Sequence, residues 1–356
     1  MKPAAFYKPD LPKTVAETQK SIRDALARRG GNVSFRALPP CDVAIYSLLD
    51  LTRFDFVNGI DAYADEFVRL LEESLEPRKK IDDNLIPCAT PVLGIGDYSA
   101  FVAGDIIFRP DTSWSTPCLK ELGDFKKLPP LGSSPWYGRF LAICEAILQR
   151  LQGTGIPFSR GYFSPLDLAH ALRGEDIYYD FYDDPEGVHE LLDYCAEATI
   201  RFAEDLYALI RKYDGGDPLS RFYSEGKINM SEDIACMISG AAYREFCAPH
   251  TQKVIDHFGV GFMHCHSRAM YLVKEICALK NVASLWLATD PNQPRPIEHV
   301  EELVRDANGV SVSIDCNSFA EIRENIGSLR KGNFSVCLPV KDPEEGRRLA
   351  EEFQKL

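Results

Sequence analysis

The second half of the chain repeats one unit, a short apolar strand followed by a helix. The first strand begins KINM and ends at the polar turn Ser231-Glu232-Asp233. The strands are five to nine residues long and do not alternate strictly, as in parallel strands that are buried on both faces. Such repetition predicts either a doubly wound sheet or a (β/α)8 barrel. The further strands are expected at 262–266, 282–290, 310–316 and 334–340, with helices between them.

Polar residues at the carboxyl ends of these strands favour the barrel. A barrel brings every strand end to one rim, where the active sites of that fold lie, whereas an open sheet would scatter them. For Asp290 and Asp315 the alternative is that each caps the following helix. The strand-end residues are Glu232, Asp233, His264, His266, Asp290, Asp315, Cys316 and Cys337.

The first half of the chain is predicted to be mixed. Residues 1–85 are expected to form an N-terminal helical extension, and residues 86–356 the α/β domain, a TIM-type (β/α)8 barrel. Ser164-Pro165 and Asp184-Pro185 each combine a capping side chain with a proline suited to the first helical turn. Helices are expected at 12–29, 59–75 and 137–151, with short strands and loops over 86–129.

Charge and cysteine usage limit the class of protein. The formal charge is −13 and no basic cluster is large enough to grip a phosphate backbone, so a nucleic-acid partner is not expected. No apolar run approaches the roughly 20 residues of a membrane span, and the N-terminus lacks a signal-type apolar core, so a cytoplasmic location is expected. The eleven cysteines include no CxxC pair, which indicates reduced thiols.

The run GVGFMHCHS contains a candidate metal site. On a strand, residues i and i+2 point to one face, so His264 and His266 can aim at one point while Cys265 faces away. Zinc needs three or four such ligands, and Cys337 at the end of the last strand is the best third. Glu232 or Asp233 could orient an imidazole or act as a base. The alternative is two hydrogen-bonded imidazoles without metal.

Two longer segments resemble the uroporphyrinogen decarboxylase superfamily. One is GIPFSRGYFSPLDLAHALRGEDIYYDFYDDPEGVHELLDY, which is similar to the central segment of that family. The other is SEDIACMISGAAYREFCAPHTQKVIDHFGVGFMHCHS, with an acidic turn, a helix and a strand that ends in His. The resemblance covers about residues 86–356 and implies a (β/α)8 barrel.

The resemblance is closer to the zinc-dependent, corrinoid-linked methyltransferases than to the decarboxylases. The methyltransferases carry a strand ending H-x-C-G and a late Cys near the last strand. His264 matches the first ligand, His266 stands in place of Cys, Ser267 in place of Gly, and Cys337 lies near the late Cys. The resemblance implies transfer of a methyl group between a corrinoid (cobalamin) and a thiol or similar acceptor, with a corrinoid protein as a partner.

The remaining candidate site residues lie at strand ends and in the loop before them. Glu232, Asp233 and Asp290 are the candidate catalytic residues, and Arg160, Tyr162 and Phe163 the candidate substrate-binding residues. Two alternatives stay open. One is a metal-free porphyrinogen carboxy-lyase, although the N-terminal Arg stretch of true decarboxylases is absent and only Arg160, Arg109 and Arg268 could grip carboxylates. The other is a non-catalytic barrel that binds a tetrapyrrole or a protein.

Overall fold

A parallel sheet forms the centre of the molecule in the computed structural model, which describes residues 8–40 and 44–356. Two expectations concern residues outside these ranges. The thiol state expected of the cysteines includes Cys41, and the expected location depends in part on residues 1–7. The sheet strands are β1 (Asn32–Leu38), β4 (Tyr162–Phe163), β5 (Lys227–Ser231), β6 (Val260–His266), β7 (Val282–Ala288), β8 (Ser311–Asp315) and β9 (Asn333–Pro339).

The sheet has the order β1-β9-β8-β7-β6-β5-β4, and every neighbouring pair is parallel. An irregular segment lies between its two outer strands. Asn84 N–H donates to the Phe35 carbonyl of β1, and Ala89 forms a parallel bridge with Phe158, just before β4. The α/β barrel architecture is thus confirmed, with seven regular strands in the described residues and this segment in the eighth position.

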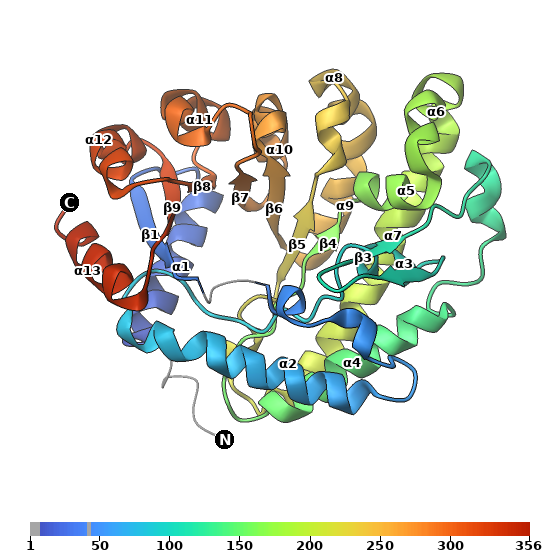
Figure 1. The fold of residues 1–356 in the computed structure, drawn as a ribbon. Coiled ribbons are helices and arrows are strands. Elements are labelled where there is room, and N and C mark those ends of the chain that lie inside the picture. Colours follow the sequence, from blue (N-terminus) through green and yellow to red (C-terminus); the bar gives the residue numbers. More distant parts are fainter. Residues whose placement is uncertain (1–7, 41–43) are drawn as a thin grey trace.

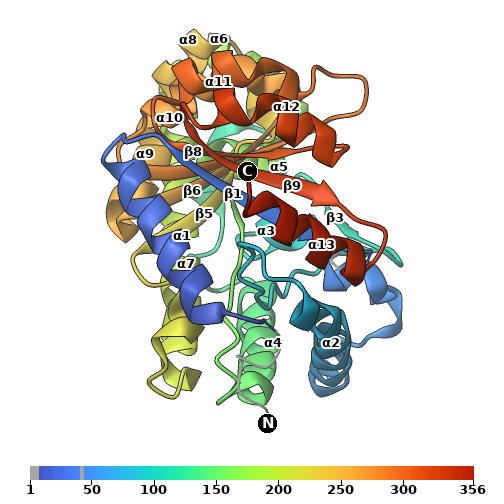
Figure 2. The same cartoon turned by 90° about the vertical axis from the view of Figure 1, so that its left-hand side faces the viewer.

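Helices surround the strands, as Figure 1 shows. Helices α10, α11 and α12 lie on the outside of the sheet, along the top of that view. Three longer helices, α2, α4 and α7, pack on one another and extend from one end of the sheet in Figure 2. The helices are α1 (Leu11–Leu26), α2 (Ile60–Leu75), α3 (Asp97–Ala100), α4 (Pro135–Leu151), α5 (Pro165–Arg173), α6 (Ile177–Asp183), α7 (Pro185–Tyr213), α8 (Gly240–Ala242), α9 (Ala248–Phe258), α10 (Val273–Ala278), α11 (Val300–Ala307), α12 (Phe319–Leu329) and α13 (Pro343–Phe353). A small antiparallel pair, β2 (Ile106–Phe108) and β3 (Ser113–Ser115), precedes α4.

The two predicted helix starts have the expected caps. Ser164 Oγ accepts from the Asp167 N–H at the start of α5, and Asp184 accepts from the Gly187 N–H at the start of α7. Because each cap is followed by proline, the first turn loses no hydrogen bond that it needs.

The boundary expected between residues 85 and 86 does not separate an extension from the sheet. β1 lies before that boundary and pairs with β9 along its whole length, from Asn32 opposite Asn333 to Leu38 opposite Pro339. The N-terminal segment therefore supplies helices α1 and α2 and also one strand of the barrel.

The barrel interior differs from the expectation of strands that are buried on both faces. In β5, β6 and β8, buried side chains alternate strictly with partly exposed ones. The buried set packs under the helices, whereas several of the partly exposed residues, such as Asn229, Phe262, His264 and Ser311, line a cavity of about 1310 Å³. Most barrels of this type are filled by layers of branched apolar side chains. Here the lumen-facing residues include six serines, so their small side chains leave the barrel hollow: Ser34, Ser159, Ser231, Ser284, Ser311 and Ser335.

Two further features follow from the described residues. The ten cysteines among them are all free, as reduced thiols should be. None of the helices in residues 8–40 and 44–356 combines the length and apolar character that a membrane crossing requires.

Candidate metal centre in the barrel

Strand β6 carries both histidines of the site on its lumen face. Their Nε2 atoms each lie 3.4 Å from Oδ1 of Asp233, which follows β5 in the neighbouring position of the sheet. Cys265 between them is fully buried on the opposite face, as the two-residue period of a strand requires. The expected orientation of His264 and His266 is therefore observed.

Hydrogen bonds at the other ring nitrogens determine the tautomers. His264 Nδ1 lies 3.2 Å from the Trp286 carbonyl oxygen, and His266 Nδ1 lies 2.9 Å from Asp290 Oδ1. Both partners are acceptors, so both Nδ1 atoms carry the proton. In the neutral rings each Nε2 therefore directs a lone pair towards Asp233.

This arrangement fits a metal ion. Oδ1 of Asp233 is buried and has no hydrogen bond within the described part of the chain. In a tetrahedral zinc site with bonds of about 2.0–2.1 Å, neighbouring donor atoms lie about 3.3–3.4 Å apart. The distances from Asp233 Oδ1 to the two Nε2 atoms match that spacing. Within the described residues, Asp233, His264 and His266 form the group of side chains that could bind a metal ion together.

The metal-free site has a different charge state. The neighbouring Asp233 carboxylate, followed by Asp290, raises the pKa of His266, so this ring would become an imidazolium between two carboxylates. Burial lowers the pKa of His264. A metal ion and a proton on His266 are thus alternative ways to balance the same carboxylates.

Cys337 does not join this group among the described residues. It lies on β9, separated from β6 by β8 and β7, and its Sγ is 3.6 Å from Ser313 Oγ. Burial raises the pKa of the Cys337 thiol, so it is protonated at neutral pH as the structure places it. In this candidate group Asp233, which the sequence suggested only as an orienting residue or base, takes the place expected for Cys337.

Glu232 faces away from the histidine side chains. Its carboxylate accepts hydrogen bonds from the hydroxyls of Ser164, Tyr243 and Thr251 in the buried layer between strands and helices. Burial raises its pKa to about 7. Glu232 therefore links the end of β5 to the start of α5 and to the helical segment that contains Tyr243 and Thr251. Its predicted catalytic role has no geometric support.

Asp167 positions the metal-site turn, a role that the sequence did not reveal. Its carboxylate accepts from the backbone N–H groups of Asp233 and Ile234 and from the Ser231 hydroxyl. The available signal was the spacing S-x-x-D at the start of α5, which usually marks a capping box. Here the carboxylate reaches across to the end of β5.

Asp290 supports His266. Its Oδ2 accepts from the Arg268 backbone N–H, and its own N–H donates to Ser267 Oγ. Burial alone would raise the pKa of Asp290, but these hydrogen bonds and His266 lower it, so the carboxylate stays charged. Asp290 does not cap a helix, and neither does Asp315, because α12 is capped by Ser318.

The predicted substrate-binding residues separate into two groups. Arg160 is 3% exposed and its guanidinium is bound by the Asp97 carboxylate, so it belongs to the core. Tyr162 is also buried, at 2%. Phe163 lines the cavity and stacks on Tyr98. Tyr162 also borders the cavity, but its side chain is almost wholly buried, so Phe163 is the more accessible of the two to a ligand.

The other two candidate arginines lie elsewhere. Arg268 is exposed at the rim, beside Asp290. Arg109 N–H donates to the Thr112 carbonyl in the small antiparallel hairpin. Neither lines the cavity within the described residues.

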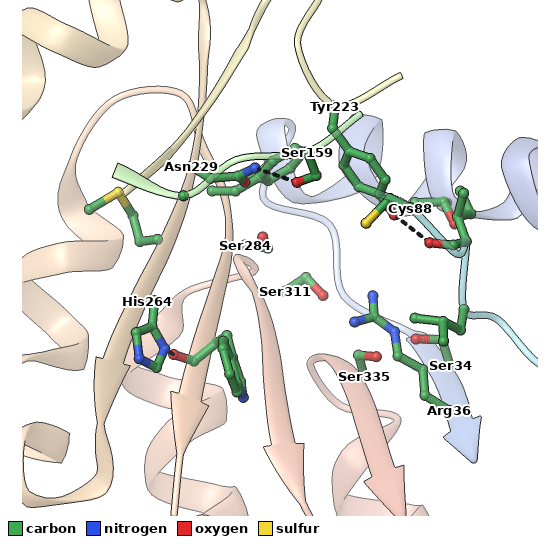
Figure 3. A pocket seen from close by; sticks show the side chains of 18 of the residues that line it. Ser34, Arg36, Cys88, Ser159, Tyr223, Asn229, His264, Ser284, Ser311 and Ser335 are labelled. Carbon is green, nitrogen blue, oxygen red and sulfur yellow. Dashed lines mark hydrogen bonds between the residues drawn. The ribbon is translucent and has the colours of Figure 1, made fainter. Parts of the chain in front are cut away.

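Trp286 forms one wall of the site. Its ring lies 4.3 Å from the His264 ring, centre to centre, and is half exposed in the lumen. Figure 3 shows His264 at one side of the pocket and Arg36 at the other, with Ser284 and Ser311 between them. A ligand in the lumen would therefore contact the candidate metal centre at one end.

Comparison with known proteins gives a partial match. No protein-family model matches the sequence. Over 156 residues the chain is 26% identical to the methylcobamide:CoM methyltransferase MtbA of Methanosarcina acetivorans, which is an enzyme. The match covers 43% of this chain and 41% of that protein, less than half of each. This partial match is consistent with the resemblance of the sequence to the uroporphyrinogen decarboxylase superfamily.

A solved structure is similar over most of the chain. It is a B12-independent methionine synthase from a Shewanella species in complex with selenomethionine, with a TM-score of 0.43 and 12% identity. The similarity covers 91% of this chain and 98% of that one.

Proposed function

We propose that this protein is a zinc-dependent methyltransferase that moves a methyl group between a corrinoid and a thiol or similar acceptor. The observation that carries the proposal is the convergence of Asp233, His264 and His266, with both Nδ1 atoms already bound to the protein. The partial match to a methylcobamide methyltransferase supports the reaction class. A corrinoid protein is the partner that this reaction implies.

The ligand set suits an activating metal. Bound zinc would act as a Lewis acid that favours the thiolate form of an acceptor thiol at neutral pH. One carboxylate and two neutral imidazoles leave the centre with a net positive charge. An anionic nucleophile would therefore be attracted to it.

The protein's own groups would hold and enclose the acceptor. Asp290 and the Trp286 carbonyl keep the two imidazoles in one orientation, which prevents their turning towards solvent. The Trp286 ring and Phe163 are among the apolar walls of the lumen, which serine hydroxyl groups also line. An acceptor held there would have its reactive end near the histidines and little freedom to turn.

A porphyrinogen decarboxylase is a weaker candidate. A tetrapyrrole with several carboxylates needs several cationic side chains. Among the described residues that line the cavity, the arginines are Arg36 and Arg330. A purely non-catalytic barrel is also disfavoured, since both histidines are positioned by hydrogen bonds and aim at a carboxylate.

Metal analysis tests the proposed centre. The wild-type protein, purified without a histidine tag, is expected to contain one equivalent of zinc per chain. Elemental analysis by mass spectrometry is the measurement. Asp233→Ala and His266→Ala should lose it, because each removes one of three ligands. Cys337→Ala is the matched control and should keep the metal, since its thiol lies outside the group. Zinc-free wild-type protein, or loss of zinc in the Cys337 variant alone, contradicts the assignment.

The reaction is tested separately with methylcobalamin. Wild-type protein should accelerate loss of the methylcobalamin spectrum in the presence of a small thiol, and Asp233→Ala should not. A zinc-loaded protein that is inactive with several thiols would leave the metal centre standing and overturn the proposed acceptor class.

A further inference from the structure

Arg36 is a cationic side chain of the lumen for which the described chain supplies no partner. It lies on β1, among the residues that line the cavity. Its guanidinium forms no hydrogen bond or ion pair within residues 8–40 and 44–356, and its Nε is buried. Figure 3 shows it pointing into the pocket beside Ser335. Arg36 is partly exposed to this cavity, and a charged group that is partly shielded from bulk water is more stable with a counter-charge.

A second unsatisfied donor lies next to it. Ser335 on β9 is 4% exposed, and its hydroxyl has no hydrogen-bond partner in the described chain. Ser335 pairs with Ser34 in the strand register, two residues before Arg36. Two neighbouring donors, one of them charged, thus face one cavity without an acceptor from the described residues, although buried polar groups are satisfied in most proteins.

Neither Asp315 nor Asp83 is bound to Arg36. Asp315, which is opposite Cys337 in the strand register, accepts from the Thr289 N–H. Asp83 is already bound by the ammonium of Lys8 and the guanidinium of Arg78, and its other oxygen accepts from the Ala37 N–H. The Cys337 thiol is protonated because burial raises its pKa. No acidic side chain of residues 8–40 and 44–356 is bound to Arg36, so an anion that enters the lumen would supply a counter-charge that these residues do not.

The position of Arg36 relative to the candidate metal centre is also informative. Around the barrel, β9, β8 and β7 separate β1 from β6 on one side. On the other side the segment around Ala89, then β4 and β5, separate them. Because three strand positions separate β1 from β6 in each direction around the barrel, Arg36 and the β6 histidines lie on opposite walls of the cavity.

We propose that the lumen is a binding site for a small organic oxyanion, with its carboxylate or phosphate-type oxygens on the Arg36 guanidinium and the Ser335 hydroxyl. A guanidinium binds two oxygens of such a group at once, and a hydroxyl adds a third donor. Ser284 and Ser311, which lie between Arg36 and His264 in Figure 3, offer further hydroxyl groups to the polar end of such a ligand, while apolar lining residues such as Phe262 would contact the rest of it. The site does not depend on metal at the opposite wall.

Titration calorimetry with two probes tests this site. Inorganic phosphate and succinate are titrated separately into wild-type protein and Arg36→Gln. At least one probe should bind wild type with one site per chain. Arg36→Gln should weaken that binding by about 10- to 100-fold, the usual effect of losing a charge-assisted pair. The better probe shows whether the natural ligand carries a phosphoryl or a carboxylate group.

Control variants distinguish binding at Arg36 from binding elsewhere on the protein. Arg330→Gln removes the other arginine of the described lining and should leave the affinity unchanged. Ser335→Ala should weaken binding less than Arg36→Gln, and Arg36→Lys should keep part of it. Since Arg36 has no partner in the described chain, its variants should unfold at the wild-type temperature. His266→Ala should bind the anion normally, so failure of the metal centre leaves this result intact. Absence of saturable binding, or binding that Arg36→Gln leaves unchanged, overturns the proposal.

Discussion

His264 and His266 each use one ring nitrogen to bind the protein and the other to face Asp233. This division of roles is typical of metal-binding imidazoles, whose second nitrogen is held by a carboxylate or carbonyl. The period of the strand places the rings on one face, but the carbonyl of Trp286 and the carboxylate of Asp290 select which nitrogen meets the metal. Residue identity alone does not specify that choice.

Removal of Asp290 should weaken metal binding without removing a ligand. Asp290→Ala is expected to lower zinc affinity by about 10- to 100-fold, because His266 loses the acceptor that orients it. The measurement is competition with a chromogenic chelator. Asp315→Ala is the control, since the Asp315 carboxylate accepts from the Thr289 N–H and not from a histidine. Equal zinc affinities of Asp290→Ala, Asp315→Ala and wild type would show that the orientation of His266 does not depend on Asp290.

At the scale of elements, the strands have two different faces. Outward residues of β6 and β8, such as Cys265 and Ile314, pack under helices, while serines and histidines face the lumen. The alternation is visible in runs such as VSVSID, although the small serine makes it weak as a hydropathy signal. The prediction that the strands are buried on both faces was wrong for β5, β6 and β8 for that reason, but β9 is buried on both faces up to its last residue.

Arg160 and Asp97 join the segment before β4 to the short helix α3. Both side chains are 1% exposed, and removal of one partner would leave the other charge buried and unpaired. Arg160→Met is therefore expected to reduce the free energy of unfolding by about 3–5 kcal/mol, measured by chemical denaturation. Arg36→Met is the matched control and should change it little, because Arg36 has no partner among the described residues. Equal effects of the two variants would contradict this assignment of Arg160 to the core.

At the scale of the whole molecule, the N-terminal segment is part of the barrel. β1 covers one edge of β9, and the segment around Asn84 and Ala89 closes the gap to β4. Without them, β9 would present a row of unpaired backbone groups, which promotes aggregation.

A fragment of residues 86–356 should therefore fail to fold. It is expected to be aggregated or to unfold without cooperativity, whereas the full chain shows one cooperative transition. Circular dichroism during heating and size-exclusion chromatography are the measurements. A soluble fragment that unfolds cooperatively and binds zinc would restore the domain boundary expected from the sequence.

The sequence by itself determined the strand–helix repeats, the helix caps at Ser164 and Asp184, and the shared face of His264 and His266. These depend on contacts within a few residues, where backbone period and capping chemistry decide the outcome. Only the tertiary structure decided that Asp233 rather than Cys337 lies beside His264 and His266, and that Glu232 turns into the helical layer. Strand order, register and the direction of each turn set such distances, and they arise from contacts between residues far apart in the chain. The hollow lumen has the same origin, since small side chains leave a cavity only once the barrel has closed around them.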